Sequence, residues 1–381
     1  MSVEKSGSEY IKRIWKVIIA MFDIDGMIDY SEQVLLEIKE KELPLVVWGF
    51  GGMISFIVSN IREFGMDISY IIDNNEKKWG KTYCGIPIIS FGKLKDSCAD
   101  CCILIGVCTK KYVDEITKQI IKDGQFKSLY FFEMFYPFGV KNKDTFRKNI
   151  GSINKVRELL EDEKSKLVFE KKLRYIINKE ADELVEISDP ECDQYFDDKL
   201  IRFDNKEVCF IDGGAYHGEN TDEIRRKFPN RDFIAVCIDA DFENVDYLIK
   251  KYENSSSTFV KWAALARNTG ELRFTNSGSR GGQIGNGEDS IVVPSIGIDD
   301  EFFSNMRVGF IKLDIEGSEK ECLWGAKKTI ERDRPILAVC NYHSVEDHWD
   351  IPLLIKSIRP DYKIYMRHYH YTGIETVVYA L

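Results

Sequence analysis

The chain has 381 residues, of which 44% are hydrophobic and 30% charged, so its length predicts two domains of ordinary soluble globular composition. Its formal net charge of −10 argues against a nucleic-acid partner, because binding phosphates requires a basic surface. No apolar run reaches the length of a membrane span and the N-terminus lacks the layout of a secretory signal, so we expect a cytoplasmic protein.

The N-terminal part predicts alternating strands and helices. Apolar residues recur at helical spacing over the first 40 residues, and the alternation follows over residues 44–135. The expected strands are "LPLVVWGF", "DISYIIDNN", "GIPIIS", "DCCILIGV" and "SLYFFE", and the expected helices are "GGMISFIVSNIREFG" and "KKYVDEITKQIIKDG". Because such alternation produces a parallel sheet, we expect a Rossmann-like domain over residues 1–140.

A glycine cluster follows the first of these strands. Gly49, Gly51 and Gly52 lie after it, and Asp73 ends the next strand, which is a layout typical of nucleotide binding. The third glycine of the dinucleotide fingerprint is missing, because Ile54 stands in its place. The domain is therefore expected either to bind a nucleotide or nucleotide sugar, or only to pack.

Four of the ten cysteines cluster in this half. Cys98, Cys101, Cys102 and Cys108 occupy a predicted helix end and the strand after it. A zinc site would need further ligands at a suitable spacing, and neither a second Cys pair nor a His lies near by. We therefore expect free thiols that are largely buried.

Residues 141–199 form a highly charged segment with apolar residues three and four positions apart as far as residue 187. This pattern predicts helices rather than a disordered linker. We interpret the segment as a helical connector between two α/β units.

Strands and helices alternate again over residues 200–381. The expected strands are "VCFID", "FIAVCIDA", "TFVKWAAL", "VGFIKLDIEG", "PILAVCNYH", "YKIYMRHY" and "TVVYAL", with an inserted hairpin from "ELRFT" and "SIVVPSIG". The connection between the last two strands is short, which only an antiparallel pair allows. We therefore expect a mostly parallel sheet with one reversed strand.

An acid and a set of glycines end the first strand of this half. Asp212, Gly213, Gly214 and Gly218 would form a tight turn that lets a ligand approach the backbone closely. Asp239 ends the next strand, where an acid commonly holds a ribose. The spacing is not a dinucleotide fingerprint, and the charge of Asp212 would repel a pyrophosphate. It suits S-adenosylmethionine, which has a sulfonium, an ammonium and a ribose but no phosphate.

Four stretches together resemble the FkbM-type methyltransferases over about residues 200–381: "FIDGGAYHGENT", "IKLDIEGSEKECLWGAKKTI", "RPILAVCNYH" and "YKIYMRHY…ETVVYAL". The resemblance implies a seven-stranded methyltransferase fold and transfer of a methyl group from S-adenosylmethionine, often to a hydroxyl of a sugar or natural product. The N-terminal stretch "DNNEKKWGKTYCGIPIIS" resembles Rossmann-like accessory domains of sugar-modifying enzymes.

The resemblance also indicates which residues bind the cofactor. They are Asp212, Gly213, Gly214, Ala215, Tyr216, Gly218, Thr221, Asp239, Ala240, Trp262 and Ala263. Tyr216 departs from the Asn that the family often has there. Trp262 is expected either against the adenine or in the core.

The candidate catalytic residues follow two other strands. Asp314 and Glu316 come after "FIKL" and would face the reacting methyl group, and His343 follows the next strand. An acid with a raised pKa or a near-neutral His would accept the proton of a hydroxyl, although an acid there often only caps a helix. The three could also hold Mg²⁺, but nothing in their spacing requires an ion, so we predict no metal ligands.

Three histidines and a glycine-rich loop are not assigned to the active site. His348, His368 and His370 are expected to be structural, and the glycine-rich loop 277–290 is expected to be a lid or a surface excursion.

Two other functions compete with the methyltransferase. One is a nicotinamide-dependent oxidoreductase that uses the N-terminal site, although that half lacks a catalytic Tyr-x-x-x-Lys. The other is a non-catalytic nucleotide-binding scaffold. The expected partner is a small-molecule or carbohydrate acceptor, and a homo-oligomer is left open.

Overall fold

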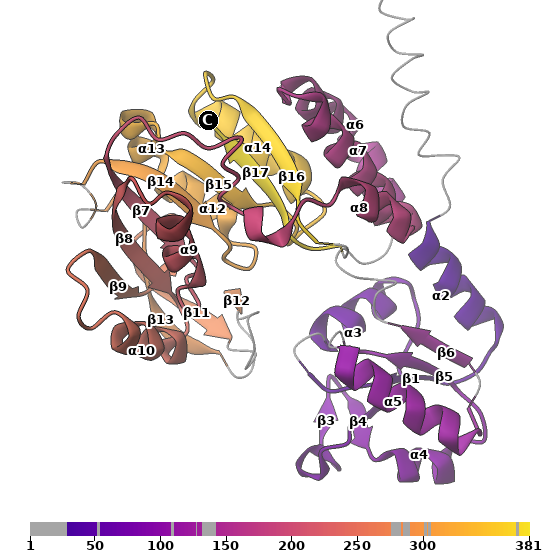
Figure 1. Cartoon of the computed structure of the whole chain (residues 1–381). Helices are drawn as coiled ribbons and strands as arrows, with labels where there is room; N and C mark the ends of the chain where they lie inside the picture. The colour runs from indigo at the N-terminus through magenta and orange to yellow at the C-terminus, as the bar shows by residue number, and fades with distance from the viewer. Residues whose placement is uncertain are drawn as a thin grey trace, which may run out of the picture.

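The computed structural model describes residues 29–51, 54–107, 110–126, 128–131, 142–275, 283–284, 290–300, 303, 306–370 and 373–381. The described chain is a mixed α/β protein with two mostly parallel sheets, one in each half (Figure 1). Three sets of expectations lie outside these ranges: the predicted helix before residue 29, Gly52 and Cys108, and most of the 277–290 loop.

The N-terminal sheet has six strands in the order β3-β4-β2-β1-β5-β6, and all neighbours are parallel except β3 and β4. This confirms the predicted parallel sheet. The strands are β1 Leu45–Trp48, β2 Tyr70–Ile72, β3 Thr82–Tyr83, β4 Ile86–Ile89, β5 Cys102–Ile105 and β6 Ser128–Phe131. The helices are α2 Tyr30–Glu40, α3 Ile54–Glu63, η1 Glu76–Lys78, α4 Phe91–Ser97 and α5 Lys110–Asp123.

The cysteines behave as small apolar residues in much of the fold. All nine within the described ranges are free thiols, and Cys101 and Cys102 are buried at the start of β5. Burial raises the pKa of Cys102, which keeps it a thiol rather than a metal-binding thiolate.

Three helices connect the halves: α6 Asn142–Leu159, α7 Glu163–Asn178 and α8 Ala181–Ile187. Their apolar stripes share one hydrophobic core with the C-terminal sheet, and Figure 1 shows them beside β16. The chain after α6 and after α8 also makes parallel bridges to β16, through Leu160–Ile364 and Ser188–His368. The segment is therefore helical as predicted, but it is a packed layer of the C-terminal half as well as a connector.

The C-terminal sheet has seven strands in the order β16-β17-β15-β14-β7-β8-β9. Only β17 is antiparallel to its neighbours, which confirms the single reversed strand. The strands are β7 Glu207–Gly213, β8 Asp232–Asp239, β9 Thr258–Trp262, β14 Val308–Leu313, β15 Ile336–Cys340, β16 Ile364–His368 and β17 Thr376–Ala380. The helical elements are η3 Glu191–Asp193, α9 Glu219–Lys227, α10 Phe242–Lys251, α12 Glu319–Gly325, α13 Lys327–Asp333 and α14 Asp347–Ile358.

The predicted hairpin is part of a small third sheet with the order β10-β13-β11-β12. Its strands are β10 Ala264–Leu265, β11 Gly270–Thr275, β12 Gln283–Ile284 and β13 Ile291–Ile296. The antiparallel pair β11–β13 is the hairpin that the sequence predicts. Among the helices of the described ranges, none has the length and apolarity to cross a membrane.

Candidate active site

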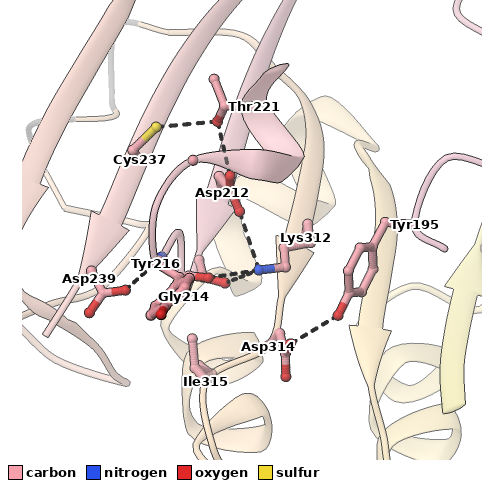
Figure 2. A network of polar contacts seen from close by, with 12 residues as sticks. Tyr195, Asp212, Gly214, Tyr216, Thr221, Cys237, Asp239, Lys312, Asp314 and Ile315 are labelled. Carbon is pink, nitrogen blue, oxygen red and sulfur yellow. Dashed lines mark hydrogen bonds and ion pairs between the residues drawn. The ribbon is translucent and has the colours of Figure 1, made fainter. Parts of the chain in front are cut away.

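The candidate site lies where β7, β8, β14 and β15 end. These strands are parallel neighbours, so their carboxyl ends meet at one edge of the sheet. That edge brings together the glycine turn after β7, Asp239 at the end of β8, and Asp314 after β14 (Figure 2). His343 follows β15 at the same edge.

Gly214 is needed for contact with the protein's own backbone. Its φ is +71°, and a Cβ at this position would lie 1.9 Å from the carbonyl oxygen of Asp314. The amides of Gly214 and Ala215 both donate to the carbonyl of Ile238 at 3.0 and 3.1 Å. The turn is therefore held between the end of β8 and the end of β14. From the sequence we expected the glycines to allow close approach of a ligand.

Asp212 is buried and faces a lysine of the neighbouring strand β14. Its side chain is 0% exposed, and its Oδ1 lies 3.3 Å from the Nζ of Lys312, which is 1% exposed (Figure 2). The hydroxyl of Thr221 donates to Asp212 Oδ2 at 2.9 Å, so Thr221 also points inward. Burial lowers the pKa of Lys312, but the carboxylates of Asp212 and Asp314 outweigh burial and raise it. The expectation that the charge of Asp212 attracts a cationic ligand is wrong, because Lys312 neutralises it.

Lys312 also supports the glycine turn. Its Nζ donates to the carbonyl oxygens of Gly213 and Gly214 at 3.0 and 2.9 Å. The buried pair of Asp212 and Lys312 therefore fixes the backbone of the proposed cofactor loop through these two carbonyl oxygens.

Asp239 holds the other side of this loop. Its Oδ2 accepts the backbone amide of Tyr216 at 2.9 Å. Its Oδ1 accepts the amide of Asp241 at 2.9 Å and the side chain of Asn244 at 3.2 Å. Tyr216 itself has a φ of +47°, and its ring stacks on His217 with centroids 3.9 Å apart.

Gly218, Trp262 and Ala263 were also predicted to bind the cofactor. Gly218, with a φ of +77°, is the N-cap of α9. Trp262 is 36% exposed and its indole nitrogen donates to the carbonyl of Ala240 at 3.0 Å, so the interpretation of Trp262 as core is wrong. Ala263 is buried, and its amide donates to the carbonyl of Asp239 at 3.1 Å.

Two tyrosines hold Asp314. The hydroxyl of Tyr195 donates to Oδ2 at 2.9 Å, and the hydroxyl of Tyr342 donates to Oδ1 at 3.0 Å. Burial raises the pKa of Asp314, but Lys312 and His343 outweigh burial and lower it. Asp314 is therefore an ionised carboxylate with a fixed orientation.

His343 lies among three carboxylates. Its Nε2 is 3.6 Å from oxygens of both Asp314 and Glu316, and its Nδ1 is 3.1 Å from Glu319 Oε1. Burial lowers the pKa of His343, but the carboxylates, Glu319 foremost, raise it to about 10. The near-neutral pKa expected for His343 is therefore wrong, and at neutral pH the ring is protonated and cannot accept a proton.

Glu316 has the pKa that a proton acceptor needs. Burial and the neighbouring carboxylates raise the pKa of Glu316 to about 7, against a lowering effect of His343. Its Oε2 lies 3.6 Å from His343 Nε2, so its carboxylate is part of the site, and its backbone has a φ of +55°.

Several residues of this region were not singled out from the sequence. They are Tyr195, Lys312, Glu319, Tyr342 and Glu375. Lys312 offered a signal, because it is a charge inside an otherwise apolar strand. Tyr195 and Glu375 offered none, because the fold brings them in from distant segments.

The other histidines have structural partners. His348 is buried with Nδ1 3.2 Å from the carbonyl of Val345, and His368 is buried with Nδ1 2.9 Å from the hydroxyl of Thr376. His370 lies 3.5 Å from Glu191. These contacts agree with the structural interpretation of all three.

A segment of each half is similar to a known protein family. Residues 210–369 match the family described as the methyltransferase FkbM domain, and residues 39–127 match the family described as C2185-like, N-terminal. No curated protein matches the chain.

Similar solved structures include methyltransferase FkbM from Methylobacillus flagellatus KT. It is 22% identical, with a TM-score of 0.63 over 96% of this chain and 98% of that one. Fibrillarin from Aeropyrum pernix, in complex with natively bound S-adenosyl-L-methionine, is 8% identical, with a TM-score of 0.31 over 48% of this chain and 70% of that one. Precorrin-6y C5,15-methyltransferase from Geobacter metallireducens GS-15 is 6% identical, with a TM-score of 0.30 over 46% of this chain and 81% of that one.

Proposed function

We propose that this chain transfers a methyl group from S-adenosylmethionine to a hydroxyl group, because residues 210–369 match the family described as the methyltransferase FkbM domain. The acceptor is a sugar, a polysaccharide precursor or a natural product in the cytoplasm. The oxygen attacks the methyl carbon in line as the carbon–sulfur bond breaks. The bond's electrons stay on sulfur, which leaves S-adenosylhomocysteine, and the hydroxyl proton passes to a base.

The hydrogen bonding of Asp239 is the observation that carries the proposal. A carboxylate offers about four acceptor positions. Three are used, by Tyr216 of the turn after β7 and by Asp241 and Asn244, which follow β8. The remaining position suits a hydroxyl donor such as a ribose. Asp239 therefore serves both the shape of the loop and the sugar of the donor.

The aromatic and small residues near Asp239 suit the rest of the donor. Trp262 is exposed beside Ala240 and packs edge-on against Phe242 with centroids 5.3 Å apart. Such a rim offers an apolar face to an adenine. The methyl group would then lie toward Asp314 and Glu316.

Glu316 is the proposed base, and Asp314 is the proposed positioning group for the acceptor. Glu316 combines a pKa of about 7 with a place at the same strand end, whereas Asp314 already accepts two tyrosine hydroxyls. The protonated ring of His343 would orient these two carboxylates.

The N-terminal unit is proposed to be an accessory domain. Asp73 there accepts the amides of Phe50 and Asn75 at 2.9 and 2.8 Å, in the manner of Asp239, and it pairs with Lys78 at 2.9 Å. Lys78 is a partly exposed cation next to the glycine turn, and a phosphate of a nucleotide sugar would compete with Asp73 for it.

The test is isothermal titration of the full chain with S-adenosylhomocysteine and, separately, with NAD. We expect micromolar binding of S-adenosylhomocysteine that weakens at least about tenfold in Asp239→Ala, since the site loses a charge-assisted hydrogen bond. Asp246→Ala, which removes an exposed acid of the adjoining helix, is the control and should bind normally. Binding of NAD alone would contradict the proposal and favour an oxidoreductase.

A further inference from the structure

Three possible metal ligands converge between the ends of β14 and β15. Asp314, Glu319 and His343 each offer one ligand atom, and these atoms all lie within 4.8 Å of one another. Two ligands on opposite sides of a first-row metal ion are separated by about 4.2 Å, given bonds of about 2.1 Å. Small side-chain rotations would therefore bring the three atoms to bonding distance of one ion.

The two most buried members each have side-chain atoms without a regular hydrogen bond among the described residues. The His343 side chain is 9% exposed, and its ring nitrogens meet carboxylate oxygens at 3.1 and 3.6 Å without a hydrogen bond of regular geometry among the described residues. Glu319 is 1% exposed, and among the same residues its Oε2 has none. Buried polar atoms are nearly always satisfied, so these atoms indicate a ligand that completes the site.

The surrounding contacts fix the ligands in place. Glu319 uses its other oxygen to accept the amide of Ile315 at 2.9 Å. Asp314 accepts the hydroxyls of Tyr195 and Tyr342. Such outer contacts orient the ligand carboxylates of metal sites.

The charges in this region favour a cation. Glu316 and Glu375 lie close to the three ligands, which adds two more acids. Lys312, which acts on Asp314, is already paired with Asp212. Among the ion pairs of the described residues, Glu316 and Glu319 each meet one basic side chain, that of His343, whereas Asp314 meets His343 and lies near Lys312.

We infer that Asp314, Glu319 and His343 bind a divalent transition-metal ion at the acceptor side of the proposed active site. Two carboxylates and one imidazole suit Mn²⁺, Fe²⁺ or Zn²⁺ better than Ca²⁺, which prefers oxygen ligands alone. The ion takes the place of the imidazole proton, because a ligand His must be neutral.

The use of the ion rests on the function proposed above. Three protein ligands leave coordination positions for oxygen atoms of a second molecule. A hydroxyl bound there becomes more acidic and is held in a fixed position. This favours an acceptor with two neighbouring oxygens, such as a vicinal diol of a sugar, which can chelate the ion.

The test uses the full chain after treatment with a chelator, titrated with Mn²⁺ and followed by electron paramagnetic resonance. We expect one tightly bound ion per chain, displaced by Zn²⁺, and binding weakened at least about tenfold in His343→Ala and Glu319→Gln. Asp314→Asn keeps the shape of the side chain and should weaken binding in the same way. Glu321→Gln changes an exposed acid of the same helix and should bind normally.

Titration with S-adenosylhomocysteine reports whether each variant is folded, and it separates this inference from the proposed function. A chain that binds S-adenosylhomocysteine but neither Mn²⁺ nor Zn²⁺ would overturn the metal site alone. Metal binding that all three variants retain would also overturn it. A chain that binds the ion but no S-adenosylhomocysteine would leave the site standing and remove the methyltransferase proposal.

Discussion

Asp212 and Lys312 form a buried ion pair, and the stability of the fold depends on both partners being present. Removing one charge leaves the other without compensation in the core, which typically costs about 3–5 kcal/mol. We expect Asp212→Asn and Lys312→Met each to lower the free energy of unfolding by about that amount. The double variant should recover part of the loss, because no lone charge remains. Urea unfolding followed by tryptophan fluorescence measures all three.

Lys206→Met is the matched control for the lysine change. Lys206 pairs with Asp232 on the surface, so its loss should change stability by less than about 1 kcal/mol. If Asp212→Asn instead leaves stability unchanged and abolishes binding of S-adenosylhomocysteine, Asp212 contacts the donor after all.

Single residues divide into those whose position the sequence predicted and those that only the fold reveals. The acids at strand ends, such as Asp239 and Asp314, could be placed because parallel strands end at one edge. The partner of Asp212 could not, because Lys312 lies 100 residues away on a strand whose register the sequence leaves open. The pKa of His343 depends on three carboxylates that only the turn after β14 brings together.

Among the elements, the docking of α7 on β16 depends on one carboxylate at the start of the helix. Asp162 is the N-cap of α7 and accepts the amide of Ser165 at 2.7 Å. It also accepts two hydrogen bonds from Arg367 of β16, at 2.7 and 3.3 Å. Loss of a cap costs about 1 kcal/mol, and a hydrogen bond to a charged group contributes about 1.5–3 kcal/mol. We expect Asp162→Ala to lower the free energy of unfolding by about 2–4 kcal/mol.

The contribution of Asp162 should depend on pH. Burial raises the pKa of Asp162, but the hydrogen bonds from Arg367 and Ser165 outweigh burial and lower it from 3.8 to about 2. Its stabilisation is therefore complete above about pH 4 and is lost as the pH falls toward about 2. Asp162→Asn keeps a capping side chain but has no such loss. The stability difference between the wild type and Asp162→Asn should shrink between neutral pH and about pH 3; a difference that grows would contradict the assignment.

Elements with a clear period were predictable, and short or composite ones were not. The helix α5 and the pair β16–β17 follow from hydrophobic spacing and connection length. The two-residue strands β10 and β12 have no period to detect, so the four-stranded sheet around the predicted hairpin could not be anticipated. An amphipathic pattern shows that α6, α7 and α8 bury one face, but it does not show which half of the chain that face packs against.

At the scale of the whole molecule, the core indicates where the C-terminal unit begins. Apolar side chains of α7 such as Val168, Phe169 and Leu173 are no more than 1% exposed and belong to the same core as the C-terminal sheet. Phe146 of α6 packs edge-on against Trp349 of α14 with centroids 5.7 Å apart. We therefore propose that the folding unit spans residues 142–381 rather than beginning near residue 200.

Two fragments test this unit. Burying one Val, Leu or Phe side chain completely contributes about 1.5–3 kcal/mol to stability. The buried side chains of the helices therefore contribute an amount comparable with the whole stability of a domain, about 5–15 kcal/mol. We expect residues 142–381 to be monodisperse in gel filtration and to bind S-adenosylhomocysteine as the full chain does. Residues 200–381 should aggregate, because the face of the sheet that α7 covers becomes exposed to solvent. Equal stability of the two fragments would mean that the helices only connect the halves, and would restore the boundary near residue 200.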